Sequence, residues 1–245
     1  MWSPMQVLQP GTFVSSTYVN TQGPLLLSQL GPPCFTPGTL IATPSGETPV
    51  EELCIGDHVL TLDSGSAPIR FLRKRTLSLA HLRDFPRHAP ITFMPGSLGP
   101  GLPMRNLRVS PQHRMLSRSN VAKRMFGQSE VLIPATALVG CPGVSRSKAR
   151  ASVTYIHILL DEHHILTANQ VETESLLLGS NIMRQFTRAE MTWLRENASC
   201  CFRQANKPAR TLITGKRVQK YLQRVAKNGH PVSTPKPARE MARAS

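Results

Sequence analysis

The chemistry that the sequence suggests begins at one cysteine. Cys34 follows the extended segment Gly31-Pro-Pro33 and precedes the short apolar run 39–43. A cysteine thiolate is the strongest side-chain nucleophile near neutral pH. A cysteine in this place could attack the carbonyl of Pro33 and convert the peptide bond into a thioester. The amide nitrogen of Cys34 would have to be protonated as it leaves, and a histidine suits that task.

The segments that must position Cys34 have the patterns of short strands separated by polar turns. The region contains almost no helical pattern beyond one turn at 50–53, so it predicts one all-β domain over residues 34–178. Basic residues alternate with apolar ones over 68–77, which predicts a half-buried edge strand. The proline in 131–139 predicts another edge strand, and residues 78–106 are expected to be mainly loop. The expected strands are 39–43, 58–62, 68–77, 91–93, 106–109, 114–116, 131–139, 153–160, 165–168 and 171–176.

Two segments of different character flank this domain. Residues 1–33 contain no charged residue and are expected to form a leader with one strand at 12–19. Residues 179–245 are expected to form a basic helical tail, partly disordered from residue 230, and a solvated appendage is the favoured interpretation of it. A helix is predicted from Thr187, which has capping-box spacing with Glu190, through about Arg195. A second helix follows residue 214 and ends at Gly229, and its expected apolar face consists of Val218, Tyr221, Leu222 and Val225. Residues 184–245 contain 14 Lys and Arg against three Asp and Glu, a balance of +11.

The five cysteines and the N-terminus limit the class of protein. Cys34, Cys54, Cys141, Cys200 and Cys201 form an odd set without metal-ligand spacing, so neither a disulfide framework nor a zinc site is indicated. The N-terminal segment lacks the basic start of a secretory signal, and its apolar run is too short to span a bilayer. We expect a soluble protein that is cytoplasmic by default, with leaderless export as the alternative.

Four blocks in order resemble the Hint domain of hedgehog proteins and inteins. The first block is Cys34-Phe-Thr-Pro-Gly-Thr39, and the second is Gly56-Asp-His-Val-Leu60. Ser110-Pro-Gln-His113 is similar to the Thr-x-x-His block of that family. The segment from Tyr155 through Asn169 is similar to the strands that close the Hint fold. The sequences of these blocks are most similar to those of a bacterial Hint subgroup. The resemblance covers residues 34–178.

The resemblance implies a role for each site residue. It implies that Cys34 is the nucleophile, that His113 protonates the leaving nitrogen, and that Ser110 stabilises the oxyanion on the scissile carbonyl. For His157, Asp161 and His164, two readings stay open: a supporting hydrogen-bond network, or ordinary polar residues of a turn. No cofactor and no metal are implied.

Two departures from the family narrow the expected reaction. Inteins end in His-Asn, where this chain has Glu174-Ser175-Leu176, so we expect no full splicing. Hedgehog domains place an acid where this chain has Arg73-Lys-Arg75, so we expect no sterol transfer. The expected substrate is the chain's own N-terminal segment, and water or an amine would capture the thioester.

The alternative interpretation is a catalytically silent β binding module. Its basic tail would contact nucleic acid or another anionic surface through non-specific, salt-dependent interactions with phosphate groups.

Overall fold

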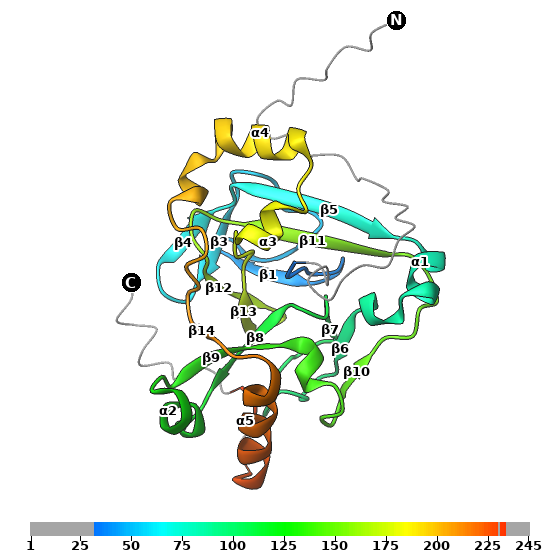
Figure 1. Ribbon diagram of the computed structural model, residues 1–245, viewed down its shortest axis with the longest axis vertical. Helices are drawn as coiled ribbons and strands as arrows, with labels where there is room; N and C mark the ends of the chain where they lie inside the picture. Colours follow the sequence, from blue (N-terminus) through cyan, green and yellow to red (C-terminus); the bar gives the residue numbers. More distant parts are fainter. Residues whose placement is uncertain (1–31, 230, 234–245) are drawn as a thin grey trace, which may run out of the picture.

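A computed structural model describes residues 32–229 and 231–233 of the chain (Figure 1). Nearly all of the expected leader, including the strand expected at 12–19, lies outside the described residues, as does residue 234 onward. Within the described part, the helices are all too short or too polar to cross a membrane.

Strands dominate the described residues, which confirms the expected all-β class. One sheet has the order β14-β9-β8-β13-β12-β1-β2, with β3 and β4 attached to β12; a second has the order β10-β6-β7, and a third pairs β11 with β5. The strands are β1 (Leu40–Thr43), β2 (Gly46–Pro49), β3 (His58–Thr61), β4 (Gly65–Pro68), β5 (Phe71–Leu77), β6 (Ile91–Phe93), β7 (Leu107–Val109), β8 (Arg114–Arg118), β9 (Glu130–Pro134), β10 (Val144–Arg146), β11 (Val153–Leu159), β12 (Ile165–Ala168), β13 (Val171–Glu174) and β14 (Thr211–Leu212).

Phe35 joins two of these sheets beside the cysteine. It forms isolated antiparallel bridges with Val109 of β7 and with Ile156 of β11. The N–H of Phe35 donates to the Ile156 carbonyl at 2.9 Å, and the N–H of Ile156 donates back at the same distance. The Phe35 ring is 1% exposed and lies in the largest apolar cluster. Burial of this ring and the two bridges fix Cys34 between the end of β7 and the middle of β11.

Helices occur in two segments where no helix was expected. Residues 78–106 contain α1 (Leu79–Asp84), whose N-terminus is capped by the Ser78 hydroxyl, and the 3-10 turn η2 (Pro86–His88). Another helix, α2 (Asn120–Phe126), begins at the Ser119 cap and ends at Gly127, which has a φ of 75°. Helices α1 and α2 are six and seven residues long, which is too short for a periodic apolar pattern. Their limits are therefore set by the capping residues.

One of the two edge-strand expectations needs correction. Strand β9 pairs with β8 on one side and with β14 on the other, so it is internal; Pro134 is its last residue and interrupts no bond between strands. Within the described residues, strand β5 pairs with β11 alone, as expected of an edge strand. Arg73 on it is nevertheless only 6% exposed and forms an ion pair with Glu190 of α4, so this arginine packs inside the molecule.

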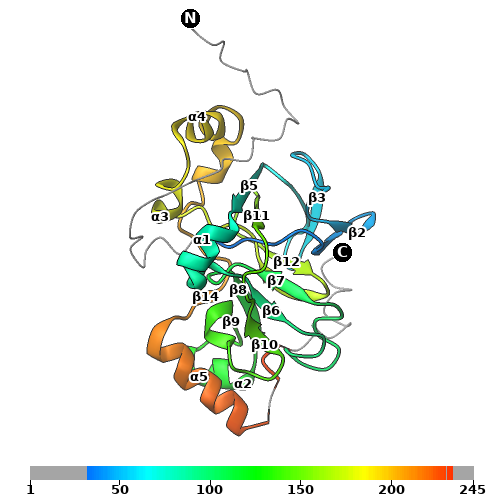
Figure 2. The ribbon, with the colours of Figure 1, turned by 90° about the vertical axis from the view of Figure 1, so that its right-hand side faces the viewer.

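The segment after residue 180 packs on the strands at two ends of the molecule (Figures 1 and 2). Helices α3 (Ser180–Met183) and α4 (Arg188–Asn197), with the turn η4 (Ser199–Phe202), lie beside β5 and β11. Thr187 and Glu190 form the expected capping box of α4. Helix α5 (Gly215–Lys227) lies at the opposite end next to α2.

Helix α5 is held by its predicted apolar face. Val218, Tyr221 and Val225 are at most 2% exposed, and the Tyr221 hydroxyl is 2.8 Å from the hydroxyls of Ser117 and Ser119. The described part of the tail is therefore integrated with the strands, whereas a solvated appendage was expected. The division of the chain at residues 33 and 178 stays a prediction.

Candidate active site

The Cys34 thiol lies in a buried pocket of backbone carbonyls and one imidazole. Cys34 is 3% exposed. Its Sγ donates to the Pro32 carbonyl oxygen at 2.9 Å and lies 3.4 Å from Nε2 of His157. Burial raises the pKa of the thiol far above its ordinary value, and Ser110, Arg75 and Arg73 oppose this only in part. The thiol is therefore protonated at neutral pH and needs a base before it can act as a nucleophile.

His157 contacts both the sulfur and the carbonyl that the sulfur would attack. Its Nδ1 is 2.9 Å from the Pro33 carbonyl oxygen, while its Nε2 faces Sγ of Cys34. A carbonyl oxygen only accepts hydrogen bonds, so Nδ1 carries the hydrogen of the neutral ring and Nε2 keeps a free lone pair. One ring can thus polarise the scissile carbonyl and accept the thiol proton.

Ser110 lies at the Cys34 nitrogen, whereas a contact with the Pro33 carbonyl was expected. The N–H of Cys34 donates to Oγ of Ser110 at 3.0 Å, and that hydroxyl donates to the Pro32 carbonyl at 3.0 Å. The N–H of Ser110 donates to the Cys34 carbonyl at 2.9 Å. Ser110 therefore holds the backbone on both sides of the Pro33–Cys34 bond, while the Pro33 carbonyl is bonded to His157.

His113 is held in one orientation by a threonine. Its Nε2 is 2.6 Å from Oγ1 of Thr173, and Thr173 donates its single hydroxyl hydrogen to the Arg114 carbonyl at 2.8 Å. The Thr173 oxygen must therefore accept from Nε2–H, which leaves a lone pair on Nδ1. That Nδ1 is buried without a hydrogen-bond partner among the described residues. No hydrogen bond joins the ring directly to the scissile nitrogen within the part of the chain that the structure describes.

Burial keeps both histidines neutral. Burial lowers the pKa of His157 to about 3, against a smaller opposite effect of the Pro33 carbonyl. Burial also lowers the pKa of His113 to about 4; the Glu174 carboxylate and the Cys34 backbone oppose this, and Arg114 adds to it. Glu174 is fully buried and accepts from the Arg114 backbone at 2.8 Å and from His163 Nε2 at 3.1 Å. Its negative charge favours a protonated His113.

These lowered values predict a loss of stability in mild acid. In the unfolded chain each histidine has a pKa of about 6.5, so between pH 6.5 and 4.5 the unfolded state binds protons that the folded state does not. The free energy of unfolding should therefore fall as the pH falls through this window, by on the order of 2 kcal/mol for each buried histidine. Urea unfolding at pH 7.0 and 4.5 measures this difference.

A His157→Gln variant should lose less stability than the wild type between these two pH values. His58→Gln is the matched control, because His58 is exposed, and it should leave the pH dependence unchanged. An equal loss of stability in the His157→Gln variant and the wild type would contradict the buried neutral state of His157.

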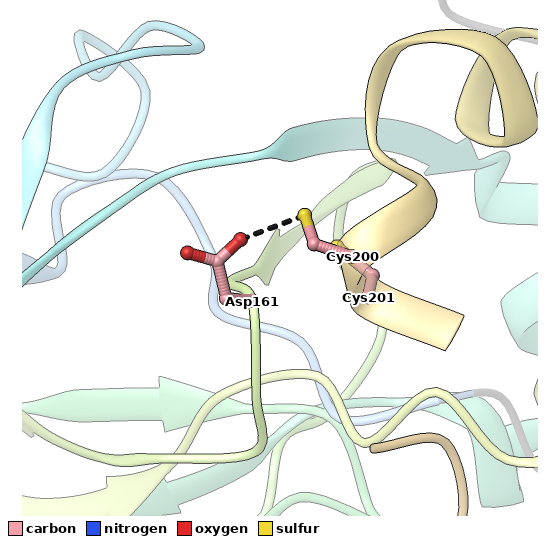
Figure 3. Close-up of side chains that lie close together, drawn as sticks. All are labelled: Asp161, Cys200 and Cys201. Carbon is pink, nitrogen blue, oxygen red and sulfur yellow. Dashed lines mark hydrogen bonds between the residues drawn. The ribbon is translucent and has the colours of Figure 1, made fainter. Parts of the chain in front are cut away.

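Asp161 and His164 are not bonded to the cysteine pocket. The Asp161 carboxylate forms an ion pair with Arg70 at 2.6 Å and accepts from Sγ of Cys200 at 2.9 Å, as Figure 3 shows for the thiol. The N–H of His164 donates to the Ser175 hydroxyl at 2.9 Å. Of the three residues expected as possible supports, only His157 contacts Cys34.

Asp161, Cys200 and Cys201 form a group that was not expected from the cysteine spacing. Their ligand atoms all lie within 4.8 Å of one another. The Arg70 guanidinium already neutralises the carboxylate, which opposes the binding of a further cation there. The members of this group come from distant parts of the chain, because Asp161 follows β11 whereas both cysteines lie in η4.

Thr173 and Glu174 are the residues of this region that sequence reasoning missed. They lie at the end of β13, next to β8 in the sheet, so β13 brings them to His113 and Arg114. A threonine and a glutamate in a strand have no distinctive spacing. The available signal was Glu174 itself, a charged residue in an apolar closing hairpin, which calls for a buried partner.

Solved structures of intein and intein-like domains match the chain at low identity and low TM-score. A bacterial intein-like domain from Clostridium thermocellum is 13% identical to this chain, with a TM-score of 0.39. The match covers 58% of this chain and 97% of the Clostridium domain. An AceL NrdHF class 3 split intein variant is 13% identical with the same coverages and a TM-score of 0.40. The gp41-1 intein is 14% identical, again with these coverages, and has a TM-score of 0.36.

No curated protein matches the chain. The family model described as Hint domain matches residues 33–180, which is more than half of the sequence. The chain therefore belongs to the Hint domain family.

Proposed function

We propose that this Hint domain cleaves its own peptide bond between Pro33 and Cys34 and releases residues 1–33. The acyl group of Pro33 moves from the nitrogen to the sulfur of Cys34, and a nucleophile then resolves the thioester. One observation carries the proposal: the buried His157 ring contacts both Sγ of Cys34 and the carbonyl oxygen of Pro33. A structural histidine needs only one of these contacts.

In the first step, Nε2 of His157 accepts the thiol proton while the sulfur attacks the Pro33 carbonyl carbon. The C–S bond forms, and the electron pair of the carbonyl moves to oxygen. The Nδ1–H of the same ring donates to this oxygen, where negative charge develops. A donor preset at such an oxygen contributes several kcal/mol to catalysis in other enzymes.

In the second step, the bond between the Pro33 carbon and the Cys34 nitrogen breaks. The nitrogen must gain a proton, and His113 is the proposed proton donor. The proton that His157 accepted from the thiol passes to the free Nδ1 of His113 and from there to the nitrogen, which leaves both rings neutral again. The Ser110 hydroxyl keeps the nitrogen in place during this transfer, since it accepts the existing Cys34 N–H. The products are a thioester between Pro33 and Cys34 Sγ and a free amino group on Cys34.

In the last step, water or an amine attacks the thioester carbon, the C–S bond breaks, and the sulfur regains a proton. The event consumes the only scissile bond, so each molecule reacts once. Full splicing is not part of the proposal. Glu174 and Ser175 stand at the matching C-terminal end, and neither side chain can cyclise as an asparagine does to release the chain that follows.

Incubation of the purified 245-residue chain with and without dithiothreitol tests the proposal. The thiol exchanges with a thioester but not with an amide, so it should accelerate the appearance of a fragment that begins at Cys34. Intact mass and N-terminal sequencing identify the fragment, and protein unfolded in guanidinium is the control that should stay whole. A folded chain that remains whole with the thiol would instead favour the silent binding module.

A further inference from the structure

Two arginines of β5 lie on the same face of the two-stranded sheet as the histidine of the site. Arg73 is paired with His157, and Arg75 is paired with Tyr155 in the register of β5 and β11. Residues directly opposite one another, and residues two apart in a strand, point to the same face. The charges of both arginines act on Cys34, where they favour the thiolate. The face that presents His157 to the thiol therefore also presents two guanidinium groups.

The two arginines differ in their partners. Arg73 donates to Glu190 at 2.9 Å and to the Gln185 carbonyl at 2.8 Å. Arg75 makes no hydrogen bond or ion pair among the described residues, and its Nε is buried. Arg73 Nη1 and His88 Nε2 are also buried without a hydrogen-bond partner in that part of the chain. A buried donor without a partner costs free energy unless a ligand or water satisfies it.

The surroundings of Arg75 are positive. Burial lowers the pKa of both His81 and His88, and the charge of Arg75 adds to both shifts; Arg87 and Arg146 act on His88 in the same direction. His81 and His88 share one hydrogen bond, with Nε2 and Nδ1 2.8 Å apart. The carboxylate that acts on His81 is that of Asp84, which is exposed. An anion beside Arg75 would relieve this repulsion and meet the unsatisfied donors.

A basic cavity lies against the apolar side chains around Cys34. It has a volume of about 240 Å³, and Arg108, Lys148 and Arg150 line it. Leu82, Ala149 and Val153 also line it, and these three pack in the cluster that contains Cys34 and Tyr155. A small anionic molecule would be attracted to this cavity, which shares a wall with the cluster around the thiol.

We propose that the nucleophile that resolves the thioester is an amine carrying a carboxylate, and that Arg75 binds this carboxylate beside Cys34. This inference rests on the proposed self-cleavage. The amine nitrogen bonds to the Pro33 carbonyl carbon, the C–S bond breaks, and the proton lost by the nitrogen ends on the Cys34 sulfur. In the product, an amide bond joins the Pro33 carbonyl carbon of residues 1–33 to the nitrogen of the acceptor. The amino group of an amino acid is one such acceptor.

The test compares glycine with glycinamide as acceptors at equal concentrations of free amine. The two differ in the carboxylate, which glycinamide replaces with a neutral amide. Intact mass measures the rate at which each adduct of residues 1–33 appears. Each rate is divided by the rate with hydroxylamine, a small neutral nucleophile that reports thioester formation. Wild type should prefer glycine by about tenfold, the scale of one hydrogen bond to a charged group.

Arg75→Gln should remove this preference, whereas Arg75→Lys, which keeps the charge, should retain most of it. The matched control is Arg224→Gln, which removes the same charge from an exposed position on α5 at the far end of the molecule (Figure 1). Division by the hydroxylamine rate corrects for the influence of Arg75 on the thiol itself.

Acetate provides a second measurement that needs no variant. It should inhibit capture by glycine in wild type without slowing the reaction with hydroxylamine. Equal normalised rates for glycine and glycinamide, or an unchanged ratio in Arg75→Gln, would overturn the inference while leaving self-cleavage intact. Absence of any product with hydroxylamine would instead overturn the proposed function.

Discussion

Replacement of Cys34 with alanine is expected to abolish thiol-induced cleavage between Pro33 and Cys34. Alanine has no sulfur to accept the acyl group, so no thioester can form for dithiothreitol to intercept. The variant should fold, because Cys34 is a small buried residue whose backbone is held by the Phe35 bridges and by Ser110. Intact mass over time, with and without thiol, measures the loss against wild type.

Cys141→Ala is the matched control for this result. Cys141 is half-buried and lies in the loop before β10, outside the cysteine pocket. The control variant should cleave at the wild-type rate. Thiol-dependent cleavage at the same bond in Cys34→Ala would mean that another group attacks Pro33, and the account of Cys34 would be wrong.

Loss of either histidine near the thiol is expected to slow cleavage by roughly 10²-fold or more, the usual scale for a positioned acid or base. His157→Ala removes both the base for the thiol and the donor to the Pro33 carbonyl. His113→Ala removes the proposed source of the proton for the leaving nitrogen. The rate of appearance of the fragment that begins at Cys34, at one thiol concentration, compares both variants with wild type.

The control for the histidines is His58→Ala, which changes an exposed residue of β3. Urea unfolding of each variant separates a chemical defect from a folding defect, because only folded protein enters the comparison. A His157→Ala variant that folds and cleaves at the wild-type rate would contradict the proposed role of this ring as both base for the thiol and donor to the Pro33 carbonyl.

The strands around Cys34 could be predicted from sequence because their patterns are local. Turn residues and β-branched runs predicted the bounds of β1, β6, β7, β11 and β12 to within about one residue of the observed ones. Helices α1 and α2 could not be found in this way, since six or seven residues are too few to show a helical period. The local signals were their capping serines, Ser78 and Ser119, and Gly127 at the end of α2.

The residues of the site could be named from the motif blocks, but their contacts could not. Sequence placed Ser110 near the scissile bond, yet the structure bonds its hydroxyl to the Pro32 carbonyl and the Cys34 nitrogen. The carbonyls of Pro32 and Pro33 are adjacent in the chain, and the one that faces Ser110 depends on the turn after β7. Likewise, pairing of β5 with β11 joins Arg73 to His157 across 83 intervening positions, which no local pattern encodes.

The C-terminal segment shows the same limit. The capping box and the apolar face correctly predicted α4 and α5, but periodicity does not say which surface covers that face. Burial of Arg73 against Glu190 and of Tyr221 against Ser117 depends on packing between distant parts of the chain. Charge counting alone therefore suggested a solvated tail where the structure has packed helices.

Hydroxylamine trapping of the folded wild-type chain tests the central claim most directly. Hydroxylamine attacks a thioester and leaves an ordinary amide intact under mild conditions. The account predicts a fragment of residues 1–33 that ends in a hydroxamate on the Pro33 carbonyl, together with a fragment that begins at Cys34. A contaminating protease would leave a free carboxylate on Pro33 instead. A folded chain that yields no Pro33 hydroxamate would contradict the account.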